Sequence, residues 1–196
     1  AIVNSVNGER QKLDLVLPLV KAHGAAVIGL TMDDRGIPKR AEDRLAIARI
    51  IVETAESMGI PRQDVIIDPL AMAVSADDQA ALETIRALQL ICDELSVNQT
   101  LGLSNISFGL PERSAINAAF MAMAVLSGVT CPIVDPTRWE MRRASLIANM
   151  LLGKDEFCMG YLSAVSSKSG PAKAAGPAAR AGQAPGQPLD ALKEAV

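Results

Sequence analysis

Polar side chains follow five apolar stretches of this sequence, each at the point where a buried strand would end. The five polar tips are Asn4-Ser5, Thr31-Met32-Asp33, Asp68-Pro69, Ser104-Asn105 and Asp135-Pro136. Their amide, hydroxyl and carboxylate groups offer hydrogen-bond donors and acceptors, with almost no cationic charge among them. A phosphate would call instead for Lys, Arg or a nest of backbone N–H groups. These residue types therefore indicate a site for a neutral heterocycle with amide-like edges.

The tips differ in how specific they are, because the same residue types also cap helices and shape turns. Ser5, Asp33 and Asp135 are explained at least as well as caps or turn residues as by a binding role. Asp68 and Asn105, together with Asn4, sit directly at the ends of apolar strands. We therefore expect those three side chains to line the site.

Apolar periodicity along the chain predicts the elements that must position these tips. The expected strands cover residues 1–5, 25–31, 65–68, 99–105 and 131–135. A helix is expected after each strand, the first ending near Gly24 and the others covering residues 42–58, 77–95, 112–127 and 138–152. Such alternation predicts a parallel sheet with right-handed crossovers, whose strand ends meet on one face.

Five βα units satisfy a small open doubly wound sheet, whereas a (β/α)8 barrel needs eight units and about 250 residues. The chain begins without Met, inside a strand that already carries a polar tip. These features favour the last five units of a barrel whose first three are absent. The predicted fold is thus α/β, of the (β/α)8 TIM-barrel type, with about five C-terminal βα units in residues 1–165. Residues 166–187, rich in Ala, Pro and Gly, predict a flexible linker.

Composition excludes several classes of function. The net charge is −3 and aromatic residues make up 3% of the chain, which argues against nucleic-acid binding. The longest apolar run, residues 118–126, is too short to span a membrane, and no signal peptide opens the chain. The three cysteines lie far apart with no CxxC spacing, so neither a zinc cluster nor a disulfide framework is expected. We expect a cytoplasmic protein with no metal site of its own.

Residues 101–108, Leu-Gly-Leu-Ser-Asn-Ile-Ser-Phe, closely resemble the pterin-binding domains of cobalamin-dependent methyltransferases. These include the methyltetrahydrofolate:corrinoid methyltransferases and the folate domain of methionine synthase. The resemblance covers residues 1 to about 162, aligned with strands four to eight of that family's barrel. It implies that Asn105 hydrogen-bonds the pterin near N5, and that Asp68, Asn4 and Ser104 also bind the pterin. The family's first three strands, which carry another pterin-binding acid, have no counterpart here.

The resemblance also implies a reaction in one-carbon metabolism. The N5-methyl group of methyltetrahydrofolate would move to the cobalt of a corrinoid, or in reverse, with Asn105 as the catalytic residue. Arg113 would meet the glutamate-bearing end of folate, although an ordinary surface Arg explains it equally well. Residues 188–196 resemble the opening of a helical corrinoid-binding module. The cobalamin or other corrinoid is therefore expected on such a downstream domain or on a partner protein, and the enzyme is expected to be a homodimer.

Two alternatives remain open. Dihydropteroate synthases share the barrel and the pterin, but they carry a Ser-Arg-Lys element where this chain has Ser104-Asn105-Ile106. The missing Lys removes the cation expected beside the pterin carbonyl, which disfavours a synthase. A non-catalytic pterin-binding fragment is the other alternative, because the chain contains only part of a barrel.

Overall fold

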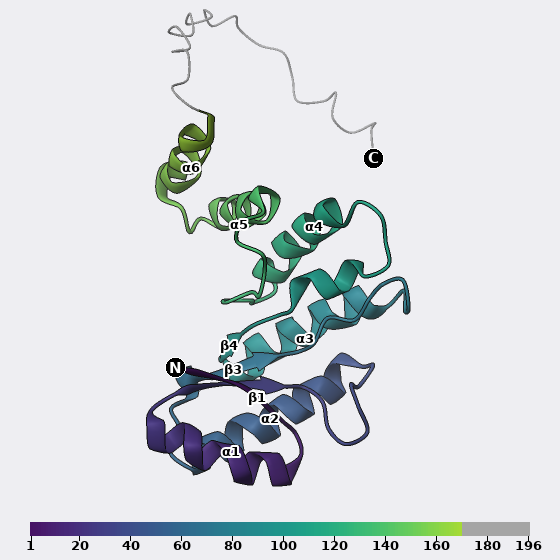
Figure 1. Cartoon of the computed structure of the whole chain (residues 1–196), viewed down its shortest axis with the longest axis vertical. Coiled ribbons are helices and arrows are strands. Elements are labelled where there is room, and N and C mark those ends of the chain that lie inside the picture. The colour runs from purple at the N-terminus through teal and green to yellow at the C-terminus, as the bar shows by residue number, and fades with distance from the viewer. Residues whose placement is uncertain (170–196) are drawn as a thin grey trace, which may run out of the picture. The chain divides into compact units, whose positions relative to one another are not determined.

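The computed structural model describes residues 1–169; strands and helices alternate in its first part, and only helices follow residue 99 (Figure 1). Contacts divide the chain into two units, and the fold described below is that of the first, Ala1–Tyr161. The elements in chain order are β1 (Ile2–Asn7), α1 (Arg10–His23), β2 (Ala26–Leu30), α2 (Ala41–Ser57), η1 (Arg62–Asp64), β3 (Val65–Asp68), α3 (Ala80–Leu95), β4 (Asn98–Gln99), η2 (Leu103–Ser107), α4 (Arg113–Leu126), α5 (Trp139–Leu151), η3 (Glu156–Cys158) and α6 (Met159–Ser169).

The four strands form one parallel sheet in the order β1-β2-β3-β4. Every strand thus lies beside the strands that precede and follow it in the sequence. In a doubly wound sheet the strand order reverses at a switch point, so neighbouring strands are not always consecutive in the sequence. The observed order is that of a barrel wall, and it confirms the predicted α/β fold of the (β/α)8 type.

Helices pack on one face of this sheet. Val27, Val65 and Ile67 belong to a core shared with apolar residues of α1, α2 and α3, such as Leu17 and Ile51. Gly29 permits the close approach of α2, because a Cβ at this position would lie 2.7 Å from Ile51 Cγ2. A second core joins α4 and α5, which lie side by side in Figure 1, to the segment around η2.

The opposite face of the sheet carries the alternate residues of each strand. Asn4 on β1, Ile28 on β2 and Ile66 on β3 lie level with one another across the sheet. Ile2, which precedes them on the same face, is 61% exposed. In a barrel this face would point inward, toward the axis.

The predicted strand over residues 99–105 is mostly wrong. β4 contains only Asn98 and Gln99, and η2 carries Ser104 and Asn105 as part of a short 3-10 helix. The neighbouring strand β3 ends at Asp68, and Pro69 beyond it has no N–H for a ladder. Without that partner the chain forms local bonds instead, such as Asn105 N–H to Gly102 O at 3.2 Å.

The predicted strand over residues 131–135 is also wrong, since the structure has only an isolated bridge between Gly102 and Ile133. Ile133 N–H donates to Leu101 O at 2.9 Å, so the segment does run beside the one that leads into η2. Cys131 N–H also donates to Gln99 O at 3.1 Å, so a few backbone bonds join the two segments without forming a regular strand.

β1 runs two residues further than predicted and ends at Asn7, which places Asn4 within the strand rather than at its tip. The register shifts between Asn4 and Val6, where β1 bulges against β2. The predicted helices are confirmed to within about one turn. The α3 helix begins later than predicted because Asp77 forms a turn, in which its Oδ1 accepts from Gln79 N–H at 3.0 Å.

None of the helices in residues 1–169 combines the length and the apolar character needed to cross a membrane. Residues 166–169 belong to α6. The rest of the predicted linker and the predicted start of a corrinoid-binding module, residues 188–196, lie outside the described residues.

Candidate functional site

The carboxyl ends of β2 and β3 form the centre of the candidate site. Leu30 pairs with Asp68, and Thr31 N–H donates to Asp68 O at 3.0 Å. Side chains alternate along β3, and Val65 and Ile67 enter the helix-side core. Asp68 therefore lies on the other face, the one that would point into a barrel.

Asp68 is the buried acid of this region, with 6% of the residue exposed. Its Oδ1 accepts a hydrogen bond from Leu70 N–H at 2.8 Å. Burial raises the pKa of this carboxyl to about 6, and the Leu70 N–H opposes part of that rise. Beside it, Thr31 is fully buried and its hydroxyl has no hydrogen-bond partner within residues 1–169. The Asp68 carboxylate can accept hydrogen bonds from the N–H groups of a ligand.

Asn4 lies on the same face of the sheet as Asp68, the face opposite the helix-side core. It pairs with Ile28, which in turn lies opposite Ile66, so Asn4 stands two residues below the level of Asp68. Asn7 is level with Asp68, but its side chain bonds Glu9 through both its oxygen and its nitrogen, at 3.1 and 2.7 Å. Asn7 is thus engaged in the turn before α1.

Asn105 is exposed on η2, and none of the residues in the described part of the chain hydrogen-bonds its side-chain amide. The Asn105 amide lies close to Gly102: a Cβ at residue 102 would be only 3.1 Å from Asn105 Nδ2. Gly102 therefore leaves the space in which this amide sits. An exposed amide without a partner can accept or donate toward a ligand.

A cavity of about 290 Å³ opens between η2 and the first turns of α4 and α5. Arg113 lines it, and its guanidinium donates to Ser104 O at 2.8 Å and to Ser107 Oγ at 3.0 Å. Arg113 thus holds the backbone of η2 beside the cavity. The full lining is Leu103, Ser104, Arg113, Ser114, Asn117, Val134, Asp135, Arg138 and Met141.

Three polar residues of this cavity, Ser114, Asn117 and Arg138, were not predicted from the sequence. Asn117 lies one turn after Arg113 on α4, and its Oδ1 is buried without a partner among residues 1–169. Arg138 precedes α5 at the opposite wall. The four-residue spacing of Arg113 and Asn117 is the signal that could have placed both on one helix face.

The structure groups the predicted site residues in two places. Asn4 and Asp68 lie on the same face of the sheet, whereas Ser104 and Arg113 line the cavity near α4. Asn105 stands on η2 next to Ser104 but outside the lining of the cavity. Their convergence on one ligand stays a prediction.

Asp33 and Asp135 fit the turn explanation given for them. Asp33 accepts from Arg35 N–H at 2.9 Å and pairs with its guanidinium, and these bonds lower the pKa of Asp33. Asp135 accepts from the N–H and the hydroxyl of Thr137, at 2.9 and 2.6 Å, which lowers its pKa likewise. Within residues 1–169 no three His, Cys, Asp or Glu side chains are grouped so that they could hold a metal ion.

The fold and the site together define an α/β protein of the (β/α)8 type, with polar groups gathered at the carboxyl ends of its parallel strands. Residues 1–135 match the family model described as pterin binding enzyme, and the chain belongs to this family. This match confirms the family predicted from residues 101–108.

Three relatives show which members of the family the chain is similar to. It is 34% identical over 179 residues to the methylcorrinoid:tetrahydrofolate methyltransferase of Eubacterium limosum, a match that covers 88% of this chain and 65% of that protein. It is 32% identical over 149 residues to the methionine synthase of Mycobacterium tuberculosis, and 31% identical over 150 residues to that of Mycobacterium leprae. These two matches cover 69% and 70% of this chain, but only 12% of either synthase. The chain thus spans less than two thirds of the length of each relative.

Proposed function

We propose that this chain is the pterin-binding part of a methyltransferase. The enzyme would move the N5-methyl group of methyltetrahydrofolate to a corrinoid held by a partner protein or another domain, or in the reverse direction. The observation that carries the proposal is the 34% identity to a methylcorrinoid:tetrahydrofolate methyltransferase across 88% of this chain. The polar residues described above would supply the hydrogen bonds that such a substrate requires.

Asp68 would bind the edge of the pterin ring. The 2-amino group and N3–H of a pterin present two donors side by side, and an ionised carboxylate accepts both. With its pKa near 6, Asp68 is ionised at neutral pH. Its low exposure keeps water from competing for those hydrogen bonds.

Asn105 would act at N5. The methyl group is bonded to a tertiary amine, which is a poor leaving group unless N5 receives a proton or hydrogen bond as the carbon–nitrogen bond breaks. The corrinoid supplies the nucleophile when it is present. The Asn105 amide can accept from protonated N5 or donate to the ring without changing its own charge. Its lack of a partner in residues 1–169 leaves it available for this role.

The cavity beside α4 would receive the glutamate-bearing end of the folate. Arg113 and Arg138 place two guanidinium groups in its lining, and a guanidinium suits a carboxylate. Asn117 adds an unpartnered amide oxygen that can accept from the ligand's amide N–H. The residues on the sheet and those of the cavity would then hold opposite ends of one substrate.

The test is calorimetric titration of this chain with 5-methyltetrahydrofolate, followed by methyl transfer to added cob(I)alamin, monitored by the change in its absorption spectrum. We expect binding and transfer. Synergistic binding of p-aminobenzoate with a pterin, without transfer, would favour a dihydropteroate synthase instead. Binding of the folate with no transfer would support a non-catalytic pterin-binding role, and no pterin binding at all would refute the proposal. The homodimer and the cytoplasmic location stay predictions.

A further inference from the structure

Arg44 is a buried cation next to the candidate site. It lies in the first turn of α2, and only 2% of the residue is exposed. A buried charge destabilises a fold unless hydrogen bonds and opposite charges compensate it. The hydrogen bonds of the Arg44 guanidinium provide this compensation.

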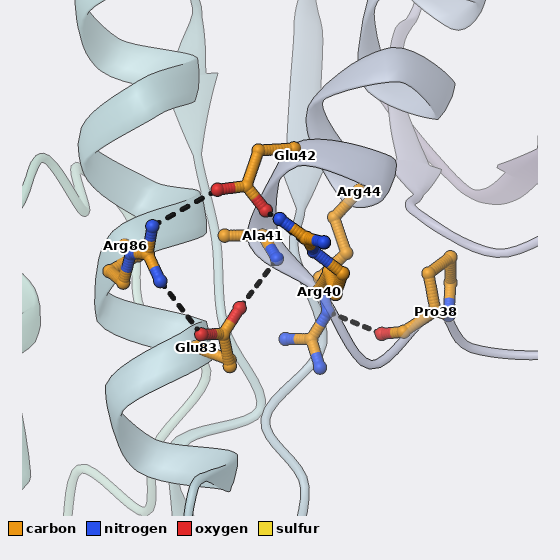
Figure 2. A network of polar contacts seen from close by, with 7 residues as sticks. All are labelled: Pro38, Arg40, Ala41, Glu42, Arg44, Glu83 and Arg86. Carbon is orange, nitrogen blue, oxygen red and sulfur yellow. Dashed lines mark hydrogen bonds and ion pairs between the residues drawn. The ribbon is translucent and has the colours of Figure 1, made fainter.

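The guanidinium connects three segments of the chain. Its Nε donates to Pro38 O at 2.8 Å, in the loop before α2 (Figure 2). Its Nη1 lies 3.2 Å from Pro69 O, 3.1 Å from Leu70 O and 3.2 Å from Thr84 Oγ1. Arg44 thus ties the turn that follows β3 to both α2 and α3.

The same turn holds the Asp68 carboxylate. Leu70 adopts a φ of 65°, which is unfavourable for a residue with a side chain, and from there its N–H reaches Asp68 Oδ1 at 2.8 Å. The carbonyls of Pro69 and Leu70 are the atoms that Arg44 binds. Arg44 therefore binds the carbonyl groups of the same turn whose Leu70 N–H binds Asp68.

A network of ion pairs connects α2 and α3 beside Arg44 without bonding to Arg44 itself. Glu83 on α3 accepts from Ala41 N–H at the start of α2 at 2.7 Å, and also from Arg86 at 3.0 Å (Figure 2). Arg86 bonds Glu42 at 3.0 Å, so α2 and α3 are connected through charged groups. The charge of Glu83 also favours the cationic form of Arg44, against the desolvation that lowers its pKa.

We propose that Arg44 is a positioning residue for the pterin site: by binding the carbonyls of Pro69 and Leu70 it fixes the turn that orients the Asp68 carboxylate. Arg44 itself touches no part of the substrate. The inference deepens the proposed function and rests on it for the identity of the ligand. A Lys at this position would keep the charge but not the fork that reaches Pro38 and the Asp68 turn together.

A double-mutant cycle tests whether Arg44 acts through Asp68. We expect Arg44→Lys and Arg44→Met to weaken binding of 5-methyltetrahydrofolate about tenfold, a size typical of coupling between residues of one hydrogen-bond network. In an Asp68→Ala background the same changes are expected to add nothing. The matched control is Arg86→Met, which disturbs the ion pairs but leaves the turn intact, and it is expected to bind as the parent chain does. Fully additive effects, or an equal loss in the control, would overturn the proposal.

A second measurement does not depend on any ligand. The Leu70 amide proton is bonded to Asp68 Oδ1, so its NMR chemical shift is expected to follow the titration of that carboxyl. Arg44→Lys is expected to abolish this dependence, whereas Arg86→Met is expected to preserve it. If the dependence survives in folded Arg44→Lys and Arg44→Met, the positioning role is refuted. If the parent chain binds no pterin but the Leu70 result holds, the proposed function fails while the role of Arg44 toward Asp68 stands.

Discussion

The backbone N–H of Leu70 donates to Asp68 Oδ1 at 2.8 Å, so the carboxylate is bound by the residue two positions after it, in the turn that follows β3. It partly compensates the burial of the carboxylate, whose pKa nevertheless stays near 6. The hydrogen bond orients the Asp68 carboxylate, while burial still destabilises its ionised form in the folded chain.

Asp68 is expected to make stability depend on pH. Its folded pKa of about 6 lies above the ordinary 3.8, so the folded chain retains a proton that the unfolded chain has lost. The stabilisation from the neutral acid is complete below 3.8 and is lost as the pH rises through 6. The free energy of unfolding of Asp68→Asn, measured relative to that of the parent chain, should therefore rise by about 3 kcal/mol as the pH increases from about 4 to about 7.

Urea denaturation at several pH values measures this difference. Asp93→Asn, at an exposed position of α3, is measured beside it so that the general effect of replacing an acid by an amide can be subtracted. A pH-independent difference for Asp68→Asn would contradict the role of burial.

Asn105→Ala is expected to leave the fold intact, because the side chain is exposed and bonds no other residue in the described part of the chain. Methyl transfer from 5-methyltetrahydrofolate to cob(I)alamin should fall about 100-fold if the amide assists at N5. Asn98→Ala is the matched control, since Asn98 bonds Gln63 O away from the site. Unchanged transfer in Asn105→Ala would remove this residue from the mechanism.

Arg113→Met separates two roles of Arg113. If the guanidinium binds the glutamate end of the folate, the variant should lose about tenfold in affinity for 5-methyltetrahydrofolate but little for a pterin without that tail. If it only holds η2 through Ser104 and Ser107, both ligands should weaken equally. Calorimetry with the two ligands decides, with Arg143→Met on the exposed side of α5 as the control.

Gly29→Ala is expected to destabilise the fold by about 1–3 kcal/mol, because the added methyl overpacks the interface of β2 with α2. The new Cβ would lie 2.7 Å from Ile51 Cγ2 and 3.1 Å from Ile67 Cδ1. Gly102→Ala serves for comparison, because the methyl there meets only the exposed side chain of Asn105. Thermal unfolding of both variants checks the contrast, and equal losses would argue against the tight contact at Ile51.

Local sequence patterns were sufficient wherever the nearest neighbours decide the structure. Gly24 adopts a left-handed conformation and ends α1 as expected, and Val65–Asp68 is a strand with the predicted bounds. Residues 101–108 identified the family. The network around Arg44 was not foreseen, because nothing in the residues near position 44 announces contacts with a turn more than twenty residues away.

Periodicity and turn residues are local properties, so they were enough to predict a series of βα units with polar residues near the ends of its strands. The position of Ser104 and Asn105 on a 3-10 helix depends on tertiary contacts, because β3 ends at Asp68 and offers no ladder partner beyond it. The burial of Asp68, its hydrogen bond from Leu70 N–H and the binding of the same turn by Arg44 likewise depend on tertiary contacts. Burial and hydrogen bonding between distant segments arise from packing, which no single stretch of residues specifies.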